Sequence, residues 1–164
     1  MGSVRAVRMR STKGRWCVAI SWLALVAAGF GQVSEGSLRA LYGKPVAGSY
    51  VVRPGVTITA IEGPKGEVCV LTISGPKTEE DLIAVIDKAV PPASRGLALG
   101  SLSECMGICR TTRNYEKVTI YSTVLAGGQL DNPAAIVTFK SKSCEARVKG
   151  FLASPKTPTA DRTN

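Results

Sequence analysis

The chain has 164 residues, a formal net charge of +9 and no histidine. This length fits one domain, and the missing histidine removes the commonest general base and the commonest metal ligand. The composition therefore argues against many hydrolase and metal-site chemistries, although it names no function.

The N-terminal 31 residues have the layout of a secretory signal peptide. Basic residues between positions 5 and 15 precede an uncharged run at 16–30, which ends in small residues. A retained membrane anchor is the alternative, but a spanning helix needs roughly 20 apolar residues. We expect export to the periplasm or the extracellular space, contact with the membrane only through this leader, and a mature start near Gln32.

The basic residues outside the leader do not form a nucleic-acid-binding pattern. Five of the 21 Lys and Arg lie in the leader, so 16 remain against 12 Asp and Glu, a net charge of +4. Only Lys140, Lys142, Arg147 and Lys149 approach a cluster, and the alternation of Lys140 with Lys142 indicates the solvent face of a strand. No nucleic-acid partner is expected.

The first half of the mature chain predicts a short helix and three strands. The helix covers 38–42, before Gly43, and a strand at 50–52 stops at Pro54. Residues 56–60 and 67–73 flank a turn that contains Pro and two Gly, which favours a β-hairpin. Its second strand is apolar on both faces and should be central in the sheet.

An amphipathic helix is predicted between Thr78 and Pro91. Thr78 is a capping residue, three acidic residues suit the positive end of the helix dipole, and Leu82, Val85 and Ile86 share one face. The acidic residues could also be read as a cation site, but helix capping already explains them. Proline then ends the helix.

The second half predicts a long loop, a hairpin and a tail. Residues 93–113 are Gly- and Ser-rich and contain two cysteines, whereas 118–124 and 134–140 alternate as strands. Residues 154–164 should form a disordered tail. We therefore predict one α+β domain at 32–153, with one main amphipathic helix packed on an antiparallel sheet of four or five strands and stapled by disulfides.

The layout of residues 49–92 resembles the opening of the C-terminal domain of TonB-type energy transducers. The shared features are an alternating strand, a Gly-containing turn, a second strand ending in Ser74-Gly75, a helix that contains Leu82, and then Pro91. The resemblance implies a periplasmic or secreted interaction domain, and it transfers no functional residue.

Four cysteines remain in the mature chain, and an even number in an exported domain predicts two disulfides. If residue 124 pairs with residue 134 in the predicted hairpin, the numbers of opposed residues add up to 258, and Cys144 lies opposite the neighbourhood of residue 114. This position is nearer to Cys109 than to Cys69 in sequence, which favours the pairs Cys109–Cys144 and Cys69–Cys105. The main rival joins Cys105 to Cys109 and Cys69 to Cys144. Zinc ligation and a redox pair are further alternatives, but the cysteine spacing is unusual for both.

No catalytic, cofactor-binding or metal-binding residue is indicated by the sequence. We expect a non-enzymatic exported interaction domain whose partner is a protein or a cell-envelope component. A small histidine-free hydrolase that uses carboxylates or a Ser/Lys pair is the alternative. Converging carboxylates in a cleft would favour the enzyme, whereas a shallow apolar patch would favour the binding domain.

Overall fold

The structure is a computed structural model that describes residues 33–125 and 128–153. The predicted signal peptide at 1–31 and the predicted tail at 154–164 therefore lie outside the described residues. No helix within the described ranges is long and apolar enough to cross a membrane.

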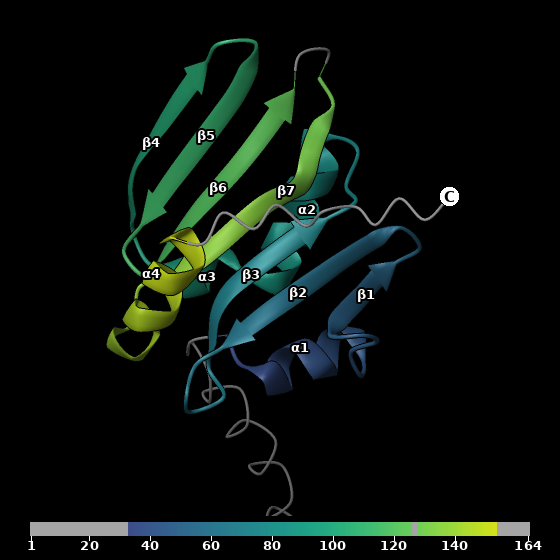
Figure 1. The fold of residues 1–164 in the computed structure, drawn as a ribbon, viewed down its shortest axis with the longest axis vertical. Helices are drawn as coiled ribbons and strands as arrows, with labels where there is room; N and C mark the ends of the chain where they lie inside the picture. The colour runs from purple at the N-terminus through teal and green to yellow at the C-terminus, as the bar shows by residue number, and fades with distance from the viewer. Residues whose placement is uncertain (1–32, 126–127, 154–164) are drawn as a thin grey trace, which may run out of the picture.

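The described strands form one antiparallel sheet in the order β1-β2-β3-β7-β6-β5-β4 (Figure 1). Two meanders, β1 to β3 and β4 to β7, join where β3 pairs with β7. Mixed α+β character is confirmed, but the sheet has seven strands rather than four or five. The strands are β1 (Ser49–Arg53), β2 (Val56–Glu62), β3 (Val68–Ser74), β4 (Ala98–Cys105), β5 (Ile108–Tyr115), β6 (Val118–Leu125) and β7 (Leu130–Phe139).

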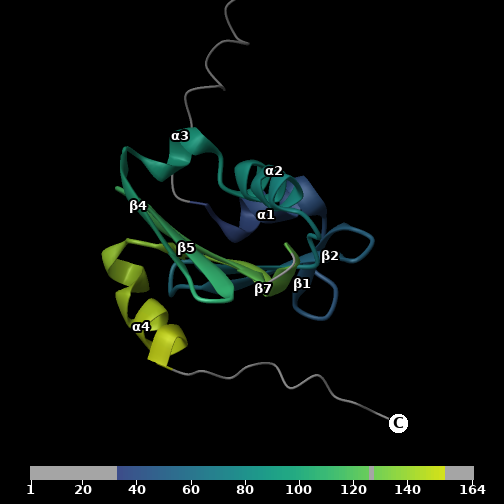
Figure 2. The same ribbon diagram turned by 90° about the horizontal axis from the view of Figure 1, so that it is seen from above.

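Helices lie on both faces of the sheet (Figure 2). One face carries α1 (Glu35–Tyr42) and α2 (Glu79–Ala89), and α4 (Glu145–Ala153) covers part of the other. A four-residue helix, α3 (Pro92–Arg95), follows α2, and the 3-10 turn η1 (Lys142–Cys144) precedes α4. The expectation of one main helix was therefore wrong.

The N-terminal ends of the first two helices follow from their capping residues. The Thr78 hydroxyl accepts a hydrogen bond from the Asp81 N–H at 3.2 Å, as the sequence predicted for α2. In α1, Ser34 and Ser37 form a reciprocal capping box, which extends this helix three residues before its predicted start.

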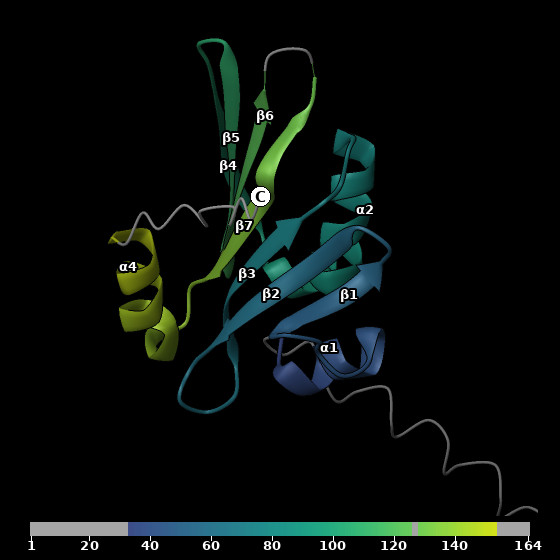
Figure 3. The same cartoon turned by 45° about the vertical axis from the view of Figure 1, so that its right-hand side comes forward.

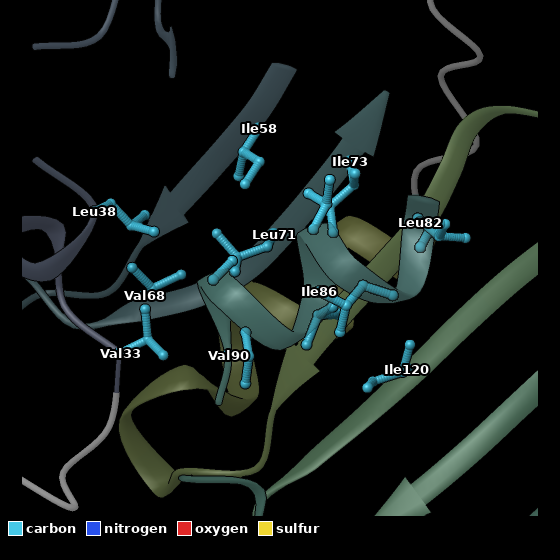
Figure 4. Close-up of a cluster of buried hydrophobic side chains, with 14 of the residues drawn as sticks. Val33, Leu38, Ile58, Val68, Leu71, Ile73, Leu82, Ile86, Val90 and Ile120 are labelled. Atoms are coloured by element: carbon cyan, nitrogen blue, oxygen red, sulfur yellow. The ribbon is translucent and has the colours of Figure 1, made fainter. Parts of the chain in front are cut away.

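The hydrophobic core lies between the sheet and the helix pair α1 and α2. Leu82 and Ile86 of α2 are buried together with Leu71 and Ile73 of β3, and Ile120 of β6 extends the same cluster (Figure 4). Burying each such side chain contributes about 1.5–3 kcal/mol. The β2–β3 hairpin is confirmed, and β3 is central because it pairs with β2 and β7.

The predicted hairpin of β6 and β7 also forms, in a register that differs by one residue. Val118 pairs with Phe139 and Ile120 with Val137, which gives a residue sum of 257 rather than 258. The strand ends at Phe139, and Lys142 already belongs to η1. Lys140 and Lys142 are therefore not alternating positions of one strand, as the sequence had indicated.

Candidate functional site

The four cysteines within the described residues form two disulfides, Cys69–Cys144 and Cys105–Cys109. The favoured pairing of Cys109 with Cys144 and of Cys69 with Cys105 was wrong, and the rival pairing is the one observed. The prediction continued β7 as a strand to Cys144. The chain instead leaves the sheet after Phe139 and enters α4, which brings Cys144 to β3.

The Cys69–Cys144 disulfide fixes α4 to the sheet. Both cysteines are fully buried with Val70, and Val148 and Phe151 of α4 pack against them. Glu67 places a carboxylate within 4.8 Å of these sulfurs, which resembles a three-ligand metal group. The sulfur atoms are bonded to each other, so they are not the thiolates that a metal would need.

A hollow of about 280 Å³ lies between α2, α3 and β5. Among the described residues that line it, the only carboxylate is Asp87 and the two cations are Arg95 and Arg113. Arg95 is buried and pairs with Asp87, while Arg113 donates to Glu79 at 2.9 Å. The charges of the hollow are therefore paired within the protein, which is a structural arrangement.

A second hollow, of about 350 Å³, brings Lys140 and Ser141 together beside Lys117. The Lys140 ammonium donates to the Asn114 side-chain oxygen and to the Tyr115 carbonyl, both at 2.7 Å. The lysine thus ties the chain just after β7 to β5. Lysines and serines meet here, but Lys140 directs its ammonium to two acceptors of β5, which is a structural role.

The hairpin of β4 and β5 is the most exposed part of the described sheet. All eight residues of β4 are exposed, and the tip of the hairpin rises beyond α2 (Figure 3). Met106 at the tip is 95% exposed, Leu97 75% and Leu102 61%. Leu99 and Ile108 are also exposed, so the hairpin exposes five large apolar side chains. We call Leu97, Leu99, Leu102, Met106 and Ile108 the hairpin apolar set.

The disulfide Cys105–Cys109 closes the tip of this hairpin. Cys105 and Cys109 are directly opposite each other, with their Cα atoms 4.1 Å apart. Gly107 has a φ of 76°, a left-handed conformation that glycine adopts without steric cost, and it allows the chain to reverse. The bridge holds the apolar tip in one conformation.

Sequence reasoning interpreted residues 93–113 as a loop and missed both strands. Alternation of apolar and polar residues reports burial, and β4 buries no side chain on either face. The available signals were two cysteines around a glycine and the Thr111-Thr112 pair, because threonine favours strands.

The two edge strands differ in how they are protected. At β1, which has five residues, an irregularity between Val51 and Arg53 interrupts the pairing, and a bridge joins Val46 to Ser49. β4 has eight residues, no proline or lysine, and an irregularity only between Ala98 and Gly100. Edge strands without such devices are available for pairing with another chain.

The face of the sheet that carries α4 has a hydroxyl-rich row, one residue from each strand. Successive pairings place these residues in line across the sheet, and none of them is buried. The row ends at β4. It comprises Ser49, Thr59, Thr72, Ile136, Tyr121, Thr112 and Leu102.

Comparison of the chain with models of protein families, with curated proteins and with solved structures finds no match.

Proposed function

We propose that the chain is an exported, non-enzymatic interaction domain that binds another polypeptide along the free edge of β4. The observation that carries this proposal is an eight-residue edge strand with every residue exposed and with apolar side chains at Leu99 and Leu102. Addition of a strand to such an edge provides backbone hydrogen bonds for affinity and side-chain contacts for specificity.

The exposed apolar side chains of the hairpin support binding over hydrolysis. The described lining of each of the two hollows contains a single carboxylate, Asp87 in one and Glu116 in the other. A carboxylate pair for acid and base catalysis would need two such groups in one cleft. The hairpin apolar set instead offers contact area without a reacting group.

Export rests on the predicted leader, and the two disulfides support it because disulfides persist in oxidising compartments. N-terminal sequencing of protein recovered from the producing cells tests this part. We expect a start near Gln32. A start at Met1 in membrane-bound material would contradict cleavage of the leader.

Site-specific photo-cross-linking tests the binding edge. A photoreactive amino acid replaces Leu102 in the full chain, and a matched variant carries it at Leu41 of α1, which is 44% exposed. In the producing cells we expect a discrete adduct from position 102 and none from position 41. Equal adducts at both positions, or none at position 102, would contradict the proposed edge.

A further inference from the structure

We infer that the polypeptide that pairs with β4 is a second copy of this chain, bound antiparallel about a two-fold axis at Leu102. This inference rests on the proposed function and specifies its partner. A two-fold contact requires one surface patch to be complementary to itself. The backbone and side-chain pattern of β4 meets this requirement.

The hydrogen-bonding pattern of the hairpin shows which backbone groups of β4 are free. Met106 donates from its N–H to the Ile108 carbonyl at 3.1 Å, so this opposed pair is hydrogen-bonded. The 4.1 Å Cα separation of Cys105 and Cys109 fits the close pairs that alternate with hydrogen-bonded pairs. By this alternation, the N–H and C=O groups of Ser101 and Ser103 point away from β5.

The sequence Ser101-Leu102-Ser103 reads the same in both directions. An antiparallel pair centred on Leu102 places Ser101 of one copy opposite Ser103 of the other, with their outward backbone groups facing each other. Leu102, which is 61% exposed in the single chain, then meets its own copy across the axis. Directly opposed apolar side chains stabilise a strand pair.

Charge does not oppose this pairing. Glu104 is the only charged residue of β4, and in this register it lies opposite Gly100 of the second copy. Glu104 also pairs across its own hairpin with Arg110, which supplies the opposite charge. The two hydroxyl-rich rows, which both end at Leu102, would become one continuous row across the dimer.

The first test introduces proline at an outward-facing position. Ser103→Pro removes an N–H that faces solvent in the single chain, where proline is tolerated on edge strands, but that bonds across the dimer. Ser103→Ala is the matched control, because it loses the hydroxyl and keeps the N–H. By sedimentation velocity over a concentration series, we expect the exported chain to dimerise, Ser103→Pro to weaken dimerisation at least about tenfold, and Ser103→Ala to change it about twofold or less.

Two results of this series would overturn the inference. One is a chain that stays monomeric at every concentration, and the other is a Ser103→Pro variant that folds and dimerises like the parent. If Ser103→Pro does not fold, Leu102→Lys replaces it, because two lysines would oppose each other on the axis. Undiminished dimerisation of a folded Leu102→Lys variant would also overturn it.

A second test reads the register directly. Opposed residues that are not hydrogen-bonded lie close enough for a disulfide, so Leu102→Cys should cross-link two copies under oxidising conditions. Leu97→Cys is the control, since Leu97 is more exposed than Leu102 but distant from its own copy in this register. Peptide mapping confirms that both native disulfides remain. Equal cross-linking of the two variants would refute the register.

The photo-cross-linking experiment distinguishes a failure of the dimer from a failure of the proposed function. An adduct of twice the chain mass from position 102 supports the dimer. An adduct with a different polypeptide, from a chain that is monomeric when purified, refutes self-pairing and leaves the proposed function standing. The absence of any adduct at position 102 contradicts both.

Discussion

Two tyrosines near α1 differ in the surroundings of their hydroxyl groups. Burial raises the pKa of both Tyr42 and Tyr50. The Tyr42 hydroxyl oxygen is buried and has no hydrogen-bond partner among the described residues, whereas Arg39 counteracts the rise in the pKa of Tyr50. A buried polar group without a partner is costly, so its removal can stabilise a protein.

We therefore expect Tyr42→Phe to leave the free energy of unfolding unchanged or to raise it by up to about 1 kcal/mol. Tyr50→Phe is the matched control and should lower it by about 1 kcal/mol, because the interaction of its hydroxyl with Arg39 is lost. Denaturant titration measures both. A marked loss of stability in Tyr42→Phe would show that its hydroxyl has a partner.

Glu67 has a pKa below its usual range. The Ser143 hydroxyl is the main cause, followed by backbone N–H groups, and the Lys65 N–H donates to the carboxylate at 2.8 Å. A folded-state pKa below the unfolded value adds stability at neutral pH, and this stability is lost as the pH falls through the folded pKa. Glu67 therefore contributes to unfolding at acid pH.

We expect Glu67→Gln to reduce the loss of stability between neutral pH and about pH 3. The same substitution at Glu145 is the control. The pKa of Glu145 is also lowered, but by an exposed contact with Lys149 one helical turn away. Such exposed pairs contribute little to stability. The measurement is the free energy of unfolding across this pH range. Identical pH profiles for Glu67→Gln and the parent would contradict the role of Glu67.

At the scale of elements, the two disulfides close loops of very different length. Cys69 and Cys144 are 75 residues apart in sequence, and Cys105 and Cys109 only four. Loop-closure entropy then assigns about 4–5 kcal/mol to the long loop and about 2 kcal/mol to the short one. The long bridge also fixes α4 to β3.

Replacing both Cys69 and Cys144 by alanine should therefore destabilise the protein by about 2 kcal/mol more than replacing both Cys105 and Cys109. Thermal and denaturant unfolding of the two double variants measures the difference. A larger loss from the Cys105 and Cys109 variant would show that the hairpin tip is needed for the rest of the sheet to fold.

Sequence patterns predicted the elements that bury apolar side chains and missed β4, which buries none. The α2 cap at Thr78 and the β2–β3 hairpin are encoded by neighbouring residues, so they could be inferred locally. β4 has no buried position, and the turn of the chain after Phe139 depends on contacts with β3. The candidate binding edge was missed because β4 buries no side chain. The disulfide pairing was missed because the path of the chain after Phe139 depends on distant contacts.

At the scale of the molecule, stability should decrease from the centre of the sheet toward β4. β3 and β7 lie in the middle and carry many buried residues, whereas β4 is an exposed edge. Amide protection follows the free energy of local opening. In dilute solution we expect slow hydrogen exchange in β3 and β7 and fast exchange at Ser101 and Ser103.

Hydrogen exchange at high protein concentration provides the comparison. The Ser101 and Ser103 amides should become protected there, while those of β3 remain unchanged. Strong protection of β4 amides in the dilute monomer would contradict the gradient of stability.

The pairing of β3 with β7 has a consequence for the order of folding. β7 is the last of the described strands, but it lies at the middle of the sheet, so β3 keeps an open edge until residues 130–139 are available. Pairing across such long sequence separations is slow, and open apolar strand edges favour aggregation. Chains that end between Cys69 and Cys144 lack the native partner of Cys69, so a Cys69 outside this bridge would mark such incomplete copies.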